Sequence, residues 1–276
     1  MSKNLFDLTG KVALVTGGSV NGGVGHALCV GFAEYGADVV VADIDEAGAQ
    51  VTAAEVLALG RKSLALTCDI SRPQDVEDLF SQLDRQFGRL DILANVPYVF
   101  PSRVRPHELS LAAWDKTLAV NLTGYFLCSQ QALLRMLPQK SGCILNISSI
   151  AGASALGRGN FPYSVSKAGI NQLTKEMAVE YAGAGIRVNA ILPASILTPG
   201  LKKELLADPR FGDRLRQRLM AGLPLGRMLD PEDLVGAAVF LCSDAAATVT
   251  GVLLPVDCGN LALNASGSHT WPTDGA

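Results

Sequence analysis

The chain has 276 residues, of which 49% are hydrophobic, 18% are charged and 28 are glycine, and its formal net charge is −3. Because average soluble domains carry about 25% charged residues and about 7% glycine, this chain is poor in charge and rich in glycine. A chain this apolar can bury a large core, which excludes disorder, and its low charge disfavours a coiled coil.

No segment predicts a membrane span, a signal peptide or a nucleic-acid surface. The most apolar stretch, residues 234–256, is interrupted by Ser243, Asp244 and Pro255, whereas a span needs about 18 or more apolar residues in a row. The first eight residues lack the apolar core of a signal peptide. No basic run occurs, and the sequence pI is about 5.6. We therefore expect neither a membrane nor a nucleic acid among its partners.

The six cysteines are dispersed, with no C-x-x-C pair, and most lie in apolar segments. This usage indicates buried free thiols and a reducing, cytoplasmic location rather than disulfides or a metal site. The cysteines are Cys29, Cys68, Cys128, Cys143, Cys242 and Cys258.

Short apolar runs alternate with longer helical patterns along the chain. In chain order, strands are predicted over residues 12–16, 38–43, 63–67, 91–94, 143–147, 186–192 and 251–256. Helical patterns lie between them: up to residue 35, over 46–59, from Pro73, over 111–136, over 162–181 and from the turn at 230–233. This alternation predicts an α/β protein with a doubly wound, seven-stranded parallel sheet and helices on both faces.

No linker rich in proline, glycine or serine divides the chain, so we interpret residues 1–276 as one domain. Ligands of such sheets bind outside the carboxyl ends of the strands, where the strand order switches. Residues 194–225 follow the sixth strand and are helix-prone but interrupted. We interpret them as a substrate lid, with a surface helical hairpin as the alternative. Residues 260–276 form a C-terminal tail.

A glycine-rich segment, residues 16–25, follows the first strand and opens a helix. Glycines there let the backbone approach a pyrophosphate that sits on the helix N-terminus. Asp43 ends the second strand at about the expected spacing, where a carboxylate accepts hydrogen bonds from ribose hydroxyls and repels a 2′-phosphate. The pattern predicts a dinucleotide site that prefers NAD over NADP. The structural alternatives are that the glycines form only a tight turn and that Asp43 is an ordinary loop carboxylate.

Tyr163 and Lys167 stand four residues apart, on one face of a predicted helix. A lysine ammonium near a phenol favours the phenolate and lowers a pKa that starts near 10, as proton transfer with an alcohol near neutral pH requires. Ser149 lies at the end of the fifth strand, where the ligand cleft is expected. The structural alternatives are that Tyr163 and Lys167 lie on a solvated helix face and that Ser149 is an ordinary turn residue.

Taken with several further motifs, these residues resemble the short-chain dehydrogenase/reductase family over residues 8–260. The matching segments are Thr16–Gly25, Cys68–Ile70, Val120–Gly124, Ser149, Tyr163 with Lys167, Arg187–Ala190, Pro224–Arg227, Pro231–Asp233 and Thr250–Asp257. The resemblance implies a Rossmann-like fold and a homotetramer, or else a dimer.

The resemblance also assigns roles to four catalytic residues. It implies that Tyr163 is the acid/base and that Lys167 tunes it and holds the nicotinamide ribose. It implies that Ser149 polarises the substrate oxygen and that Asn121 anchors a water in the proton relay. The expected cofactor contacts are Gly17, Ser19, Asn21, Gly23, Val24, Asp43, Asp69 (at the adenine), Ile70, Asn95, Tyr163, Lys167, Pro193, Ile196 and Thr198 (at the carboxamide).

Three departures from the family pattern lie beside the expected cofactor. The glycine loop has two extra residues within positions 19–22, which lengthen the turn or add a contact through its serine or asparagine. The family's Asn-Asn-Ala-Gly reads Asn-Val-Pro-Tyr over residues 95–98, where the proline removes a backbone donor and the tyrosine adds a bulky ring. Ala194 stands where the family has a glycine.

The substrate side contains Arg103, Arg105 and Arg158 in segments expected to line the pocket. Because arginine recognises carboxylate, phosphate or sulfonate through a planar fork, we consider an anionic substrate bound by Arg103 and Arg158; surface arginines are the alternative. His107 is interpreted as a loop histidine. Trp271 in the tail is expected to dock on a subunit or the pocket, or to lie in a disordered end.

We predict an NAD-dependent dehydrogenase that moves a hydride between a substrate carbinol carbon and nicotinamide. The expected substrate is a secondary alcohol, a polyol or a sugar, or the matching ketone. Two alternatives remain: a 3-oxoacyl reductase, which usually uses NADP, and a non-catalytic nucleotide-sensing protein with a remodelled cofactor groove.

Overall fold

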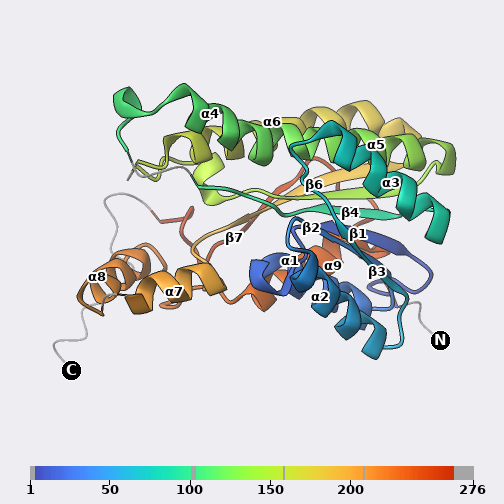
Figure 1. Ribbon diagram of the computed structural model, residues 1–276, viewed down its shortest axis with the longest axis horizontal. Helices are drawn as coiled ribbons and strands as arrows, with labels where there is room; N and C mark the ends of the chain where they lie inside the picture. Colours follow the sequence, from blue (N-terminus) through green and yellow to red (C-terminus); the bar gives the residue numbers. More distant parts are fainter. Residues whose placement is uncertain (1–3, 101–103, 158, 208, 264–276) are drawn as a thin grey trace.

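Seven parallel strands form the central sheet of the protein, shown in a computed structural model that describes residues 4–100, 104–157, 159–207 and 209–263 (Figure 1). The strand order is β3-β2-β1-β4-β5-β6-β7, so the order reverses between β1 and β4. The strands are β1 (Val12–Thr16), β2 (Asp38–Asp43), β3 (Ser63–Thr67), β4 (Ile92–Asn95), β5 (Gly142–Ile147), β6 (Ile186–Pro193) and β7 (Leu253–Val256). The predicted doubly wound parallel sheet is confirmed.

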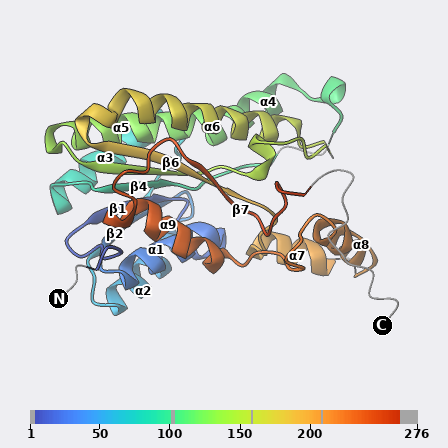
Figure 2. The ribbon, with the colours of Figure 1, turned by 180° about the vertical axis from the view of Figure 1, so that it is seen from behind.

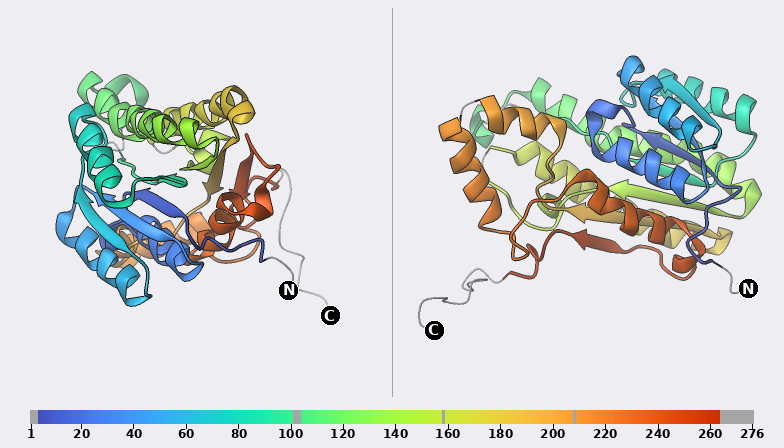
Figure 3. Two further views of the ribbon diagram at one scale, coloured as in Figure 1. Left: turned by 90° about the vertical axis from the view of Figure 1, so that its right-hand side faces the viewer. Right: turned by 90° about the horizontal axis from the view of Figure 1, so that it is seen from below.

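Helices cover both faces of this sheet, and Figure 3 shows the two layers with the strands between them. One layer contains α1 (Val24–Glu34), α2 (Glu46–Ala58) and α9 (Val235–Cys242). The other contains α3 (Pro73–Phe87), α4 (Leu111–Leu118), α5 (Gly124–Gln139) and α6 (Phe161–Tyr181). Among the residues described, no helix has the length and apolar character needed to cross a membrane.

The strands are apolar throughout because both faces of the sheet are buried. In β1, Leu14 packs into the core on the side of α3, α5 and α6, whereas Val15 packs into the core on the side of α1, α2 and α9. The same alternation runs through β2, where Val40 and Val41 face opposite cores. The described residues thus build two apolar cores, one on each side of the sheet.

The predicted helix over 111–136 is instead two helices joined by a π-helical segment, Ala119–Thr123. A π-turn inserts an extra residue into the helix and is often found at functional sites. Asn121 lies in this turn and is completely buried. The π-turn therefore places this asparagine side chain inside the protein, beside the loop that follows β4.

Two further helices, α7 (Pro199–Ala207) and α8 (Pro209–Met220), stand at one end of the molecule, outside the helical layers (Figure 2). They follow β6, so they lie at the carboxyl edge of the sheet, where ligands of such folds bind. The helix-prone, interrupted character predicted for residues 194–225 is confirmed.

Candidate active site

Ser149, Tyr163 and Lys167 line one cavity of about 990 Å³ at the carboxyl edge of the sheet. Ser149 follows β5, and its hydroxyl accepts a hydrogen bond from the amide of Ala151 at 3.1 Å. Tyr163 and Lys167 lie one turn apart on α6, and only 8% and 1% of their surfaces are exposed. The structure thus brings together the three residues that the sequence singled out.

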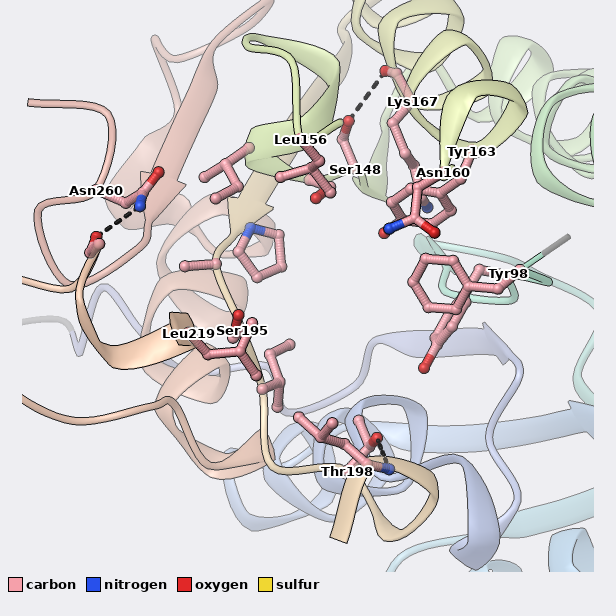
Figure 4. A pocket seen from close by; sticks show the side chains of 18 of the residues that line it. Tyr98, Ser148, Leu156, Asn160, Tyr163, Lys167, Ser195, Thr198, Leu219 and Asn260 are labelled. Carbon is pink, nitrogen blue, oxygen red and sulfur yellow. Dashed lines mark hydrogen bonds between the residues drawn. The ribbon is translucent and has the colours of Figure 1, made fainter. Parts of the chain in front are cut away.

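The ammonium group of Lys167 is held by buried oxygen atoms. Its Nζ donates to the carbonyl of Ile147 at 2.7 Å and to the hydroxyl of Tyr125 at 3.4 Å. The Ser148 hydroxyl lies 3.1 Å from the main-chain carbonyl oxygen of Lys167 (Figure 4). Because burial disfavours the charged form, the pKa of Lys167 is lowered to about 7.

The Tyr163 phenol differs from the expectation that lysine lowers its pKa. Burial raises the pKa of Tyr163, and a hydrogen bond with the Ser149 hydroxyl opposes this rise only in part. Lys167 Nζ lies 5.6 Å from the centre of the Tyr163 ring. In this arrangement burial therefore disfavours the phenolate form of Tyr163.

Asn121 uses its side chain to hold the loop after β4. Its Oδ1 accepts from the amide of Val99 at 2.8 Å, and its Nδ2 donates to the Val99 carbonyl at 3.0 Å. Its Nδ2 also donates to Ser166 Oγ at 3.2 Å. The asparagine therefore connects this loop to α6 at Ser166, the residue immediately before Lys167.

The glycine loop packs tightly against the start of α1. Gly17 and Gly23 have φ angles of 72° and 75°, which favour glycine. A Cβ on Gly25 would lie 1.8 Å from the Gly17 carbonyl oxygen, so no side chain fits there. The N-terminus of α1 has no side-chain cap. Its free amides fit a bound pyrophosphate.

The inserted residues of this loop are tied to two carboxylates. Asp43 Oδ2 accepts from the Ser19 amide at 3.0 Å. Asp45 Oδ2 accepts from the Ser19 hydroxyl at 2.7 Å and from Asn21 Nδ2 at 2.9 Å, and these hydrogen bonds, first that of Asn21, lower the pKa of Asp45. The insertion is therefore an ordered turn (Val20–Gly22) fixed to the end of β2. Asp45 was not predicted.

The remaining expected cofactor residues fall into two groups. Val24, Pro193, Ile196 and Thr198 line the same cavity as Ser149, Tyr163 and Lys167. The others lie outside its lining, near the ends of β1 to β4: Gly17, Ser19, Asn21, Gly23, Asp43, Asp69, Ile70 and Asn95.

Asp69, Ile70 and Asn95 each have a structural partner. Asp69 Oδ1 accepts from the Ser71 hydroxyl at 2.7 Å, and Ile70 is buried. Asn95 Nδ2 donates to Asn146 Oδ1 at 3.0 Å, joining β4 to β5. Asn95 Oδ1 is buried with no hydrogen-bond partner in the part of the chain described.

The departures after β4 shape the wall of the cavity. Burial raises the pKa of Tyr98, and the side chain of Thr198 opposes this rise in part. The Tyr98 ring lies edge-on to the Phe100 ring, with centroids 5.1 Å apart, and the Phe100 and Tyr163 ring centroids are 4.3 Å apart. A Cβ on Gly17 would lie 3.0 Å from Pro97 Cγ. The bulky residues thus pack around Tyr163, and Pro97 occupies the space beside the glycine loop.

Of the predicted substrate residues, Arg103 and Arg158 lie outside the described residues, as does Trp271. Arg105 and His107 are exposed at a short 3₁₀ turn, and neither lines the cavity. The sequence interpretation missed other residues that line the cavity or support it. They are Tyr125, Arg214, Arg218 and Asn260.

Comparison with known proteins identifies relatives along nearly the whole chain. Residues 17–260 match the family described as enoyl-(acyl carrier protein) reductase. The chain is 39% identical over 254 residues to cis-4-hydroxycyclohexanecarboxylate dehydrogenase of Sinomonas cyclohexanicum, covering 92% of this chain and 97% of that protein. It is 39% identical over 255 residues to D-threitol dehydrogenase of Mycolicibacterium smegmatis, covering 92% and 94%.

Solved structures share the fold. A short-chain type dehydrogenase/reductase from Mycobacterium marinum matches with a TM-score of 0.84 and 33% identity, covering 93% of this chain and 97% of that one. A protein from Agrobacterium tumefaciens, assigned as a 2-deoxy-d-gluconate 3-dehydrogenase and solved with bound NADP, matches with a TM-score of 0.84 and 35% identity, covering 95% and 100%.

Proposed function

The chain belongs to the short-chain dehydrogenase/reductase family and is an oxidoreductase that acts on CH–OH groups; we propose that it is an NAD-dependent dehydrogenase of a small secondary alcohol. The observation that carries the proposal is the meeting of Ser149, Tyr163 and Lys167 in one cavity. A cyclic hydroxy acid and a polyol, named for the two relatives, are the substrate classes that we consider.

We propose that Tyr163 transfers the hydroxyl proton. When bound, the nicotinamide ring accepts or supplies the hydride. In oxidation, the alcohol O–H bond breaks, its proton passes to the Tyr163 phenolate, and the C=O bond forms. In reduction, the buried phenol returns this proton to the substrate oxygen. The Ser149 hydroxyl polarises that oxygen, and the Lys167 ammonium stabilises the phenolate.

The end of β2 supports NAD over NADP. Asp43 and Asp45 both place carboxylates there, and the next residue, Glu46, adds a third acidic group. A 2′-phosphate at this position would meet like charges, whereas ribose hydroxyls could donate to Asp43. The glycine loop and the uncapped start of α1 would hold the pyrophosphate.

We propose two further features, one within the chain and one between subunits. Helices α7 and α8 act as the substrate lid of the one domain. Exposed apolar side chains on α5 and α6 support a subunit interface of the expected homotetramer or dimer. These side chains are Phe126, Leu134, Leu137, Phe161, Val165 and Val179.

The test is NADH formation, followed by absorbance, with a panel of secondary alcohols. The panel includes polyols and cyclic hydroxy acids, each with NAD and with NADP, and a 3-oxoacyl thioester with NADPH. Tyr163→Phe should lower turnover roughly a thousandfold, because general acid–base catalysis contributes roughly 10²–10⁴-fold, while calorimetry should show NAD affinity within about threefold of the parent enzyme.

Tyr181→Phe is the matched control, because Tyr181 lies on the same helix outside the cavity. It should retain parental turnover. Retained turnover in Tyr163→Phe would refute the assignment of the acid/base. Thioester reduction with NADPH alone would favour a 3-oxoacyl reductase, and NAD binding without turnover on any substrate would favour a nucleotide sensor.

A further inference from the structure

The cavity beside the catalytic residues is lined mainly by apolar side chains. Aromatic rings of Tyr98 and Phe100 stand beside Tyr163. Leu156 and Leu219 approach from the opposite side of the opening in Figure 4. A polyol needs a hydrogen-bond partner for each hydroxyl that it buries, and unpaired hydroxyls in apolar surroundings are costly. Hydroxyl and amide groups such as Ser154, Asn160 and Ser195 also line the cavity, but apolar side chains predominate, so most of the lining fits a hydrocarbon ring.

The charged residues of the lining all carry positive charge. They are Lys167 from α6 and Arg214 and Arg218 from α8. Within the described residues, neither aspartate nor glutamate lines this cavity. Because no aspartate or glutamate that the structure describes pairs with Arg218, a negatively charged ligand gains attraction at this side chain at short range.

Helix α8 turns one face toward the cavity. Arg214, Leu215, Arg218 and Leu219 line it, a spacing of i, i+1, i+4 and i+5 that places two arginines one turn apart above two leucines. Arg218 has no ion pair or hydrogen bond to any residue that the structure describes. Arg216, on the same helix, does not line the cavity.

The two arginines lie on a different element from the reacting groups. Ser149 and Tyr163 come from the end of β5 and from α6, whereas α8 stands at the far end of the carboxyl edge (Figure 1). A ligand that reaches both therefore needs an anionic group several bonds from its carbinol carbon.

We propose that the substrate is an alicyclic or aromatic hydroxy acid whose carboxylate binds Arg218, with Arg214 beside it, while its carbinol lies at Tyr163. This inference rests on the proposed dehydrogenase function. The guanidinium fork of arginine binds a carboxylate through parallel hydrogen bonds. The ring of the substrate fills the apolar space between the two ends. The anionic subsite is thus formed by α8, whereas the reacting groups come from the end of β5 and from α6.

The test compares two anionic probes, 3-hydroxycyclohexanecarboxylate and 4-(1-hydroxyethyl)benzoate, each with its uncharged methyl ester. Meso-erythritol represents the polyols. The parent enzyme should prefer at least one acid over its ester by about tenfold in kcat/KM, the size expected for a charge-assisted hydrogen bond. Arg218→Gln should remove this preference, mainly by raising KM for the acid, and should leave kcat/KM for the ester unchanged. Arg218→Lys, which keeps the charge but loses the fork, should fall between them.

Arg216→Gln is the matched control, because it removes one arginine from the same helix outside the cavity. It should leave the preference for the acid intact. NAD-dependent turnover of esters or erythritol at least as fast as the acids, or an acid preference that survives in Arg218→Gln, would overturn this inference and leave the dehydrogenase function standing. Absence of NAD reduction with every probe would overturn both.

Discussion

The cavity has two walls that are held in place by different interactions. The catalytic wall, formed by β5 and α6, is fixed by buried hydrogen bonds: Ser148 Oγ donates to Asn171 Oδ1 at 2.6 Å, and Asn146 Nδ2 donates to Thr174 Oγ1 at 3.0 Å. The lid wall, formed by α7 and α8, meets the core through partly buried apolar side chains such as Leu219.

This difference separates chemistry from recognition. Reacting groups need geometry held to within about 0.5 Å, and networks of buried hydrogen bonds supply it. A wall that packs mainly through apolar contacts moves more easily as a unit, which suits the entry and release of substrate. Single substitutions in the catalytic wall should therefore change the activity strongly, whereas single substitutions in the lid wall should change it only moderately.

The largest effect is expected at Lys167, the most deeply buried cation of the catalytic wall. Lys167→Met keeps the length of the side chain but removes the ammonium, so the Tyr163 phenolate loses its nearest positive charge. Turnover should fall roughly a hundredfold or more. Steady-state rates of NADH formation measure it, with Lys175→Met, an exposed position on the same helix, as the control. If Lys167→Met lowered turnover no more than Lys175→Met does, the prediction would be contradicted.

The same substitution should change the pH dependence of stability. Burial lowers the pKa of Lys167 from 10.5 to about 7, so the folded protein binds fewer protons than the unfolded chain between these values. The free energy of unfolding therefore rises with pH across this range. Lys167→Met should remove that rise and be more stable than the parent at pH 7 and below. Urea unfolding without nucleotide, at about pH 7 and about pH 9.5, measures this difference. An equal change in the free energy of unfolding with pH in both proteins would contradict the prediction.

Much of the fold could be predicted because buried parallel strands are continuous apolar runs. The errors have local causes. The last strand was expected from residue 251 but begins at Leu253, since Gly251 adopts a φ of 76° and donates its amide to the Val188 carbonyl. The π-turn around Asn121 was read as ordinary helix because one extra residue in a turn leaves no clear trace in the apolar period.

The catalytic wall was easier to predict than the lid. Tyr163 and Lys167 share a helix face by sequence spacing alone, and Ser149 follows a strand, so local rules bring them to one edge. Arg218 reads as an ordinary charge on a solvated helix, and Tyr125 as a core aromatic. Only the tertiary packing shows that Arg218 lines the cavity and that Tyr125 contacts Lys167.

A moderate effect is expected at the attachment of the lid. Asn260 Nδ2 donates to the Gly222 carbonyl at 2.5 Å, which joins the segment after β7 to the end of α8 (Figure 4). Asn260→Ala removes this bond, while Leu219 and Leu223 still pack beneath the helix. KM for the alcohol should rise about fivefold with kcat nearly unchanged, because one neutral hydrogen bond contributes about 1 kcal/mol. A larger fall in kcat than rise in KM would show that the lid is as rigid as the catalytic wall.

The smallest effect is expected at Tyr125, which supports the catalytic wall from behind. It is fully buried on α5, its hydroxyl donates to the Ile147 carbonyl at 3.1 Å, and it accepts from Lys167 Nζ at 3.4 Å. Burial raises the pKa of Tyr125 well above its usual value, so the group stays a neutral phenol. Both donors converge on one strand carbonyl, and the phenol acts as a positioning group for the lysine.

Tyr125→Phe keeps the packing and removes one acceptor from the Lys167 ammonium. The bond is long and the Ile147 carbonyl remains, so kcat should fall only about threefold near pH 7. Because the charged lysine loses a partner, the pKa of Lys167 should fall further, and the loss of kcat on the alkaline side should begin at lower pH. A role in packing alone would lower kcat equally at every pH. The shape of the profile, compared with that of Tyr181→Phe, therefore decides whether the hydroxyl acts through the lysine.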